Sequence, residues 1–110
     1  MQAYSPEMDA FEAIAEPSRR RIIELLASGE HSAGDIVAAL PQLTQPAVSR
    51  HLRVLRESGL VGVRADAQRR IYGLEPAGLV IVEAWLSRYR TFWNDHLASL
   101  EAHLVEDGSK

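Results

Sequence analysis

Apolar residues recur at intervals of three and four positions through the first half of the chain, which is the period of an amphipathic helix. Four such segments follow one another, and we predict helices over about 6–16, 17–28, 32–40 and 44–58. Ser32 and Asp35 have the spacing of a capping box, and Thr44 is a capping hydroxyl before a proline that the first helical turn tolerates. A three-residue turn, 41–43, joins the last two helices, which is helix-turn-helix spacing.

The apolar pattern changes after Gly59. Alternating apolar positions on either side of the polar stretch 65–68 predict a β-hairpin over about 60–74 with a basic tip. Pro76 then begins a final helix that the pattern extends to about 106, a length of roughly 45 Å. This order of elements predicts a winged helix-turn-helix, a mainly α fold with a small β-hairpin wing, in a single domain over 1–110.

The composition is that of an ordinary globular protein, with 46% hydrophobic and 25% charged residues in a chain of 110. The chain has no cysteine, which excludes disulfides, thiolate metal sites and cysteine nucleophiles and fits a reducing cytosol. The longest apolar run, 78–82, is far shorter than the roughly 20 residues of a membrane span, and residues 1–10 lack the pattern of a secretory signal. We therefore expect a cytoplasmic protein with no membrane partner.

Positive charge is concentrated in one part of an otherwise acidic chain. The formal net charge is −3, yet residues 44–72 hold six arginines and two acids, a net of +4, so the remainder carries −7. Phosphates meet a local patch and not the average charge of a protein, so this segment favours contact with double-stranded DNA. On charge alone, a solvated basic face is the alternative.

The helix predicted over 44–58 separates into two faces at 100° per residue. We expect Val48, Leu52 and Leu55 on its packing face, and Gln45, Ser49, Arg50 and Arg53 on its exposed face. Glutamine, arginine and serine side chains match base-edge chemistry, and the N-terminal residues of a recognition helix are the ones that reach bases. His51 lies at the edge of the apolar arc, so a packing role and a DNA contact are both open. The arginines at 19–21 are open to phosphate contact or to a solvated or ion-paired role.

Three segments, "AEPSRRRIIELL", "TQPAVSRHLRVLRESGLV" and "RRIYGLEP", resemble in sequence and order the ArsR-type (ArsR/SmtB) winged-helix transcriptional regulators. The second is the most specific, because it contains the recognition-helix signature of that family before a Gly-Leu-Val strand entry. The resemblance covers about 10–104 and implies a dimeric DNA-binding regulator, usually a repressor of its own operon. The resemblance implies four base-reading candidates, Gln45, Ser49, Arg50 and His51. It implies phosphate contacts from Thr44 and from the wing residues Arg64, Gln68, Arg69 and Arg70.

The final predicted helix carries more apolar surface than one small core can cover. Its large apolar residues are Leu79, Val82, Trp85, Leu86, Tyr89, Phe92, Trp93, Leu97, Leu100 and Leu104. Exposed apolar patches of that size mark interfaces, so we predict a homodimer built by the first and last helices, with Phe11 and Ile14 in the contact. The aromatic residues of the last helix have a second interpretation, as the wall of a pocket for an organic effector; they are Trp85, Tyr89, Phe92 and Trp93.

Metal-sensing relatives carry a Cys-x-Cys pair at the start of the third helix, where this chain has Ser32 and Gly34. A zinc site across a dimer is conceivable on the last helix, from Asp95, His96, His103 and Glu106, but their spacing differs from the family's pattern. The segment "WLSRYRTFW" instead resembles a branch of the family without a metal site. We therefore predict no metal and no cofactor, and the sequence does not identify a small-molecule effector.

Two other classes of function compete with DNA binding. An enzyme is disfavoured, because the sequence has no glycine-rich phosphate loop, no HExxH and no nucleophile elbow. A winged helix that contacts only proteins is the second alternative, but it would have no use for the arginines of "AQRRIY".

Overall fold

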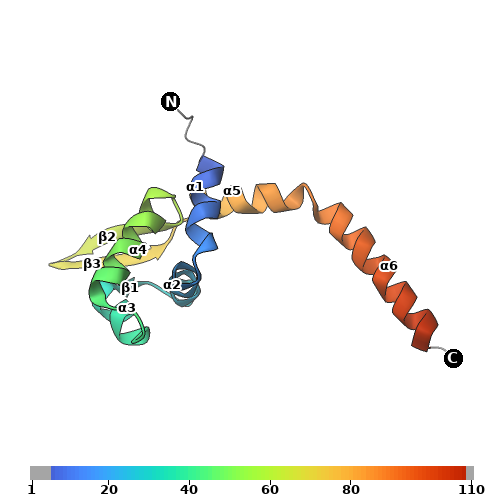
Figure 1. The fold of residues 1–110 in the computed structure, drawn as a ribbon. Helices are drawn as coiled ribbons and strands as arrows, with labels where there is room; N and C mark the ends of the chain where they lie inside the picture. Colours follow the sequence, from blue (N-terminus) through green and yellow to red (C-terminus); the bar gives the residue numbers. More distant parts are fainter. Residues whose placement is uncertain (1–5, 109–110) are drawn as a thin grey trace.

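The computed structural model of the chain describes the backbone of residues 6–108 and the side chains of residues 10–104. Its elements, in chain order, are α1 (Pro6–Ala15), α2 (Pro17–Ala27), β1 (His31–Ser32), α3 (Ala33–Ala39), α4 (Gln45–Glu57), β2 (Val61–Asp66), β3 (Arg69–Leu74), α5 (Pro76–Ser87) and α6 (Arg90–Gly108). Figure 1 shows α1 to α4 gathered into one body around the strands, while α5 leads outward from α1 and α6 extends beyond it. The winged helix-turn-helix predicted from the sequence is confirmed.

Local capping determines where the central helices begin. The Ser32 hydroxyl accepts from the Asp35 N–H at 3.1 Å, and the Asp35 carboxylate accepts from the Ser32 N–H at 3.3 Å, so the predicted capping box is present at α3. The Thr44 hydroxyl accepts from the Ala47 N–H at 3.2 Å and caps α4. These two caps set the turn between α3 and α4.

The core lies where α2, α3 and α4 meet the sheet. Its fully or almost fully buried side chains include Ile22, Leu26, Ile36, Val48, Leu52, Leu55 and Leu60. The three positions predicted for the packing face of α4 are all at most 2% exposed, so the rotation of this helix agrees with the sequence pattern.

The wing is part of a three-stranded antiparallel sheet with the strand order β1-β3-β2. Asp66 pairs with Arg69, so a two-residue turn, Ala67 and Gln68, closes the hairpin, with Ala67 at φ 58°. The sequence pattern missed β1, whose two residues, His31 and Ser32, pair with Tyr72 and Ile71 of β3. A two-residue strand has no periodicity of its own, because only its distant partner defines it.

A Schellman motif ends α4 and connects it to the wing. Gly59 has φ 77°, its N–H donates to Arg56 O at 3.1 Å, and the Leu60 N–H donates to Leu55 O at 3.0 Å. The Gly59 carbonyl then accepts from the N–H of Gly78, in the first turn of α5, at 2.8 Å. Two glycines thus bring the end of α4 against the beginning of α5.

The prediction of one continuous final helix over 76–106 is wrong, because the helix breaks between Ser87 and Arg90. The Ser87 hydroxyl donates to Ala84 O at 2.9 Å, and Arg88 N–H and Tyr89 N–H bond three residues back, to Trp85 O and Leu86 O. A serine hydroxyl that bonds a helix carbonyl competes with the backbone ladder and bends the helix. No glycine or proline lies at this break, so the sequence pattern did not predict it.

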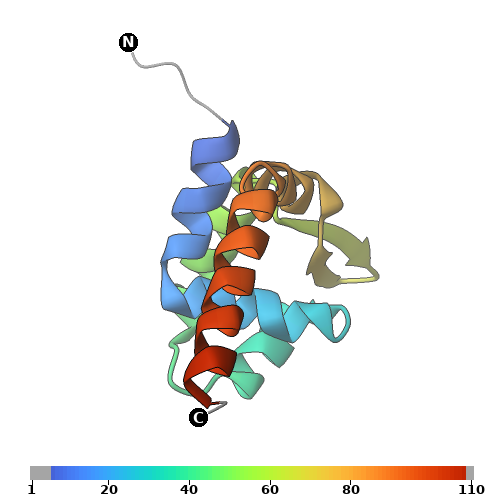
Figure 2. The same ribbon diagram turned by 90° about the vertical axis from the view of Figure 1, so that its right-hand side faces the viewer.

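The break directs α6 away from the body. The radius of gyration is 18.7 Å, against about 13 Å for a compact domain of this length. In Figure 1, α6 and the hairpin of β2 and β3 extend from opposite sides of the body, and Figure 2 views the molecule from the side of α6. Among the described residues, no helix combines the length and the apolar character needed to cross a membrane.

Candidate nucleic-acid interface

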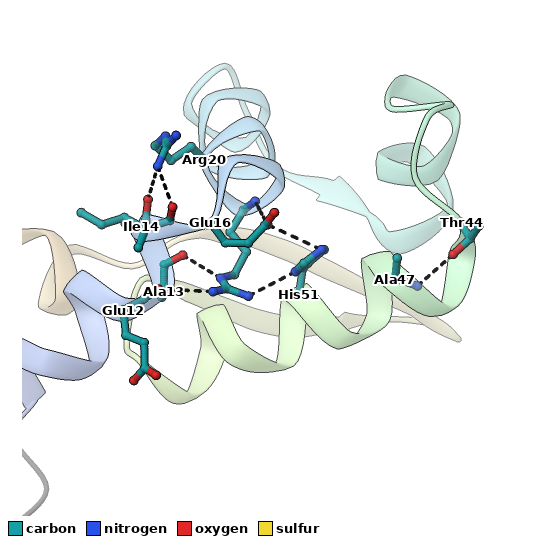
Figure 3. Close-up of polar contacts among 10 residues, drawn as sticks. Glu12, Ala13, Ile14, Glu16, Arg20, Thr44, Ala47 and His51 are labelled. Carbon is teal, nitrogen blue, oxygen red and sulfur yellow. Dashed lines mark hydrogen bonds and ion pairs between the residues drawn. The ribbon is translucent and has the colours of Figure 1, made fainter.

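The exposed face of α4 carries three of the four side chains that the sequence assigned to base reading, Gln45, Ser49 and Arg50, but not the fourth, His51. Gln45, Ser49, Arg50 and Arg53 are all exposed, opposite the buried Val48, Leu52 and Leu55. A shallow concavity on this face is lined by Pro46, Ser49, Arg50 and Arg53. The hydroxyl of Thr44 is already engaged as the cap of α4, although the residue is exposed (Figure 3). The first half of α4 therefore presents donors and acceptors on a surface open to solvent.

A groove continues this surface toward the wing. Its lining includes Arg53 and Arg56 of α4 and Val61 and Val63 of β2. Arg56 is exposed and lies in the last turn of α4, yet the site predicted from the sequence omitted it. Its position one turn after Arg53 was the signal in the sequence that could have identified it.

Two of the three wing arginines, Arg64 and Arg69, pair with acids in the structure of the single chain. Arg64 on β2 forms a two-point contact with Glu30, with Nη2 to Oε1 at 2.9 Å and Nε to Oε2 at 3.2 Å. Arg69 at the start of β3 lies 3.4 Å from Asp35 of α3. The hydrogen bond and the charge of Arg64 lower the pKa of Glu30, while hydrogen bonds with Ser32, aided by Arg69, lower the pKa of Asp35. These two carboxylates were missing from the site predicted from the sequence.

The remaining wing candidates, Gln68 and Arg70, are exposed at and next to the tip of the hairpin. The register explains why Arg64 reaches Glu30 and Arg70 does not. Arg70 lies opposite Ala65, and Arg64 lies opposite Ile71, so Arg64 and Arg70 project from opposite faces of the sheet. Arg64 and Arg69 are therefore on the face that Glu30 crosses, and Arg70 is on the other face.

His51 faces the interior of the protein. Its Nδ1 lies 3.4 Å from Arg19 Nη1, its Nε2 lies 3.7 Å from Glu16 Oε2, and its side chain is 13% exposed. Burial lowers its pKa, as do the charges of Arg19 and Arg50, while Glu16 acts in the opposite direction. The sequence left open a packing role and a DNA contact for His51, and this geometry agrees with the packing role.

Two of the arginines at 19–21 cap the end of α1. Arg19 Nε donates to Ala13 O at 2.6 Å and Nη2 to Glu12 O at 3.2 Å, and Arg20 Nη1 donates to Ile14 O at 2.6 Å and to Ala15 O at 3.1 Å (Figure 3). The last carbonyls of a helix have no partner within it, and cationic side chains often supply one. Arg19 and Arg20 thus stabilise a helix end, whereas Arg21 is exposed.

The side chains predicted for a dimer contact lie on α1, α5, α6 and the turn between α5 and α6. Phe11 of α1 packs edge-on against Trp85 with ring centroids 5.2 Å apart, and Trp85 lies 5.0 Å from Tyr89. Most of the others remain strongly exposed in the single chain, namely Phe92, Trp93, Leu97 and Leu100, at 47–62%. Ile14 is half-buried and packs against the core.

The structure also places the residues of the alternative zinc site. His96 stacks on Phe92 with centroids 5.9 Å apart, and His103 lies seven residues further along the same helix. That spacing separates the two histidines by about 10 Å along the axis. Among the residues that the structure describes, no group of three or more His, Cys, Asp or Glu side chains is placed to hold a metal ion. The side chain of Glu106 lies outside the described residues.

Comparison with known proteins gives consistent matches. Residues 16–63 match the profile of the family described as bacterial regulatory protein, arsR family. The chain is 40% identical over 91 residues to the HTH-type transcriptional regulator Rv2034 of Mycobacterium tuberculosis, covering 83% of this chain and 84% of that protein. It is 30% identical over 81 residues to the transcriptional repressor SdpR of Bacillus subtilis, covering 74% and 89%. A crystal structure of a possible transcriptional regulator for arsenical resistance superposes with a TM-score of 0.68 at 43% identity, covering 86% and 95%.

Proposed function

The chain belongs to the arsR family of bacterial regulatory proteins, and we propose on that premise that it is a repressor that binds a near-palindromic operator as a homodimer. It is a DNA-binding regulator of transcription and not an enzyme. The observation that carries the proposal is the exposed polar face of α4, which lies opposite a fully buried apolar face and next to a basic wing.

Base reading is assigned to the first half of α4. Gln45, Ser49 and Arg50 are exposed within the first two turns, where the side chains of a recognition helix reach base edges in the major groove. Arginine pairs with guanine by two hydrogen bonds, glutamine pairs similarly with adenine, and serine accepts or donates to either. Sequence specificity is therefore expected to depend on these three side chains.

Phosphate contacts are assigned to the surface around that helix. Arg53, Arg64, Gln68, Arg69 and Arg70 are exposed along α4 and the wing, and Thr44 lies at the N-terminus of α4, where backbone N–H groups favour an anion. The groove lined by Arg53 and Arg56 extends this basic surface from α4 to β2. Contacts of this kind fix the orientation of the protein and supply most of the salt-dependent affinity.

The proposed dimer contact uses α1, α5 and α6. Ten large apolar side chains between Leu79 and Leu104 are each at least 36% exposed, and Leu104 reaches 67%. On α6, Trp93, Leu97, Leu100 and Leu104 repeat at intervals of four, three and four, which aligns them along one stripe. A second copy related by a two-fold axis would cover this stripe and place two α4 helices on two half-sites, about one DNA turn or a multiple apart.

The test begins with the DNA that the protein captures from its own genome, sequenced to define an operator. Binding to that operator and to a random duplex is then measured by fluorescence anisotropy across a salt series. Arg50→Ala and Ser49→Ala are expected to cost about 1–3 kcal/mol at the operator with little loss on random DNA, because they remove base contacts. Arg70→Ala should weaken both duplexes and reduce the log–log salt slope by about one unit.

Arg90→Ala is the matched control, because Arg90 pairs with Glu83 of α5 at 2.7 Å, away from α4 and the wing. It removes one arginine outside the proposed DNA-binding surface. Losses on operator and random DNA that are as equal for Arg50→Ala and Ser49→Ala as for Arg70→Ala would show that α4 does not read sequence.

A further inference from the structure

A polar cluster joins the end of α1 and the start of α2 to the middle of α4, and Figure 3 shows it in close-up. Glu16 and Arg19 come from the α1–α2 junction, and His51 comes from α4. The ring of His51 lies between them, with Nδ1 at 3.4 Å from Arg19 Nη1 and Nε2 at 3.7 Å from Glu16 Oε2. Both ring nitrogens of one histidine on the DNA-reading helix are thus directed at another part of the fold.

Glu16 and Arg19 are themselves fixed by helix ends. The Glu16 carboxylate caps α2 by accepting from the Arg19 N–H at 3.1 Å. Two side-chain groups of Arg19 donate to α1, at Ala13 O and Glu12 O, and its Nη1 points toward the histidine. Each partner of His51 is therefore anchored to backbone, which leaves the cluster little freedom to follow α4 if that helix turns.

The contacts are consistent with one protonation state of the ring. Arg19 has no acceptor, so Nδ1 must accept, and the proton of neutral His51 is on Nε2, on the side of Glu16. Burial lowers the pKa of His51 from its ordinary 6.5, and the charges of Arg19 and Arg50 lower it further against the opposing charge of Glu16. The neutral ring is thus the form that fits between a guanidinium and a carboxylate near pH 7.

His51 is placed where it can control the direction of the base-reading side chains. It follows Ser49 and Arg50 in the same turn of α4. The apolar contacts of Val48, Leu52 and Leu55 are non-directional and resist rotation of the helix only through packing. A rotation of about 20° moves a side-chain tip roughly 6 Å from the axis by about 2 Å, more than a hydrogen bond to a base tolerates.

We propose that Glu16, Arg19 and His51 form a positioning cluster that fixes the rotation of α4 relative to α1, and that His51 acts through this cluster and not by touching DNA. The inference rests on the proposed function of α4 as the base-reading helix. In a dimer built on α1, the same cluster would set how the two α4 helices stand relative to the two-fold axis.

Arg20 provides a matched control for the cluster. It stabilises the same end of α1 as Arg19, through Ile14 O at 2.6 Å and Ala15 O at 3.1 Å, and both of these acceptors belong to α1. Arg19 differs in that it also reaches α4. A comparison of Arg19→Ala with Arg20→Ala therefore separates the loss of a helix cap from the loss of the contact with α4.

The first experiment measures operator affinity and random-duplex salt slope for the wild type, Arg19→Ala, Arg20→Ala, His51→Leu and His51→Asn. Arg19→Ala and His51→Leu are expected to weaken operator binding about tenfold and to leave the salt slope unchanged, since no phosphate contact is lost. Arg20→Ala should stay within about threefold of the wild type. His51→Asn, which keeps an acceptor in place of Nδ1, should restore most of the affinity lost in His51→Leu.

Several results would overturn the proposal. A fall of about one unit in the salt slope of His51→Leu would make His51 a phosphate contact. A loss confined to one base pair of the operator would make it a base contact. Equal losses in Arg19→Ala and Arg20→Ala would reduce the role of Arg19 to capping.

A second measurement needs no DNA and separates this inference from the proposed function. A double-mutant cycle of Arg19→Ala and His51→Leu in urea-induced unfolding should give non-additive changes in stability, because the two side chains are in contact. Additive changes would overturn the cluster even if the protein binds its operator. A wild type that shows no salt-dependent binding to any duplex would instead overturn the proposed function, while a non-additive cycle would still confirm the contact.

Discussion

The body of the molecule and its C-terminal arm, α5 and α6, have similar apolar content but use it differently. In the body, the large apolar side chains of α2, α3 and α4 are largely removed from solvent, and Ile22, Ile36 and Leu55 are fully buried. On the arm, ten large apolar side chains between Leu79 and Leu104 are exposed, and four of them are aromatic. The body buries most of its large apolar side chains within one chain, and the arm leaves most of its own exposed.

Polar contacts show the same contrast. The helix ends of the body are closed by the Ser32 capping box, the Thr44 cap and the Schellman motif at Gly59. On the arm, Gly78 N–H bonds to Gly59 O of the body, but the side-chain hydrogen bonds of Ser87 to Ala84 O and of Arg90 to Glu83 stay within the arm. We therefore expect the body to carry the fold and the proposed DNA-reading surface, and the arm to make its contacts with a second chain.

The largest effect is expected on the free energy of unfolding, when a buried leucine of the body is replaced. The same change at an exposed leucine of the arm is the comparison. Leu55→Ala removes a fully buried side chain and should cost about 2–5 kcal/mol of unfolding free energy. Leu97 is 50% exposed in the single chain, so Leu97→Ala should instead weaken dimerisation. Urea unfolding at two protein concentrations and sedimentation of both variants measure the two effects. A wild type that sediments as a monomer at micromolar concentration would remove the dimer from the comparison.

The second prediction concerns the joint between body and arm. A Cβ on Gly78 would lie 2.7 Å from the Gly59 carbonyl oxygen, against backbone that cannot move aside. Gly78→Ala should therefore destabilise the fold by about 1–3 kcal/mol and displace α5. Gly34→Ala is the control, because its Cβ would meet only the Ser32 hydroxyl at 3.8 Å within α3, where alanine is favoured over glycine by roughly 0.5–1 kcal/mol. The midpoint temperature of thermal unfolding should fall for Gly78→Ala and rise for Gly34→Ala. Equal shifts would show that the contact between Gly59 and Gly78 tolerates a Cβ.

The sequence predicted the body better than the arm for a physical reason. The boundaries of α3 and α4 follow from local contacts within three residues, at Ser32 and Thr44, and the buried face of α4 follows from its apolar period. The bend of the arm depends on a hydroxyl bond at Ser87, and serine is common in unbroken helices, so no local rule identified it.

The proposed DNA-binding site also has parts that local sequence patterns predict and parts that they do not. Exposure of Ser49 and Arg50 follows from the helical wheel, which is local information. The ion pairs of the wing join residues 34 positions apart. They exist because β1, which lies between Glu30 and Asp35 in the chain, pairs with β3 of the hairpin. The wheel left the role of His51 open, because its partners come from the α1–α2 junction and not from α4 itself.

A third and smaller effect tests whether the body limits its own affinity for DNA. The stem of Glu30 crosses β3 at Gly73, where a Cβ would lie 3.1 Å from its Cγ, and reaches Arg64 on β2. Glu30→Gln should release Arg64, raise random-duplex affinity by about threefold at low salt, and steepen the salt slope by up to about one unit. Anisotropy titrations measure both quantities.

Glu83→Gln is the control for that experiment, because it breaks the pair of Glu83 with Arg90 on the arm and changes the net charge by the same amount. The two variants should differ in DNA binding even though their charges agree. Equal gains in both would mean that overall charge, and not the release of a wing arginine, sets the affinity.

The smallest expected effect is the response to metal ions, which tests whether the arm is more than an interface. A ligand shifts an equilibrium only by its differential affinity for the two states, so metal-controlled release of DNA would need a site that prefers the DNA-free form. The chain has no cysteine, and His96 and His103 lie about two helical turns apart on α6. We expect zinc, nickel, cobalt and copper to change operator affinity by less than about twofold relative to a chelator control. A change of about tenfold, or about 1.4 kcal/mol of coupling, that disappears in His96→Ala or His103→Ala would instead assign the arm a zinc site shared between two chains.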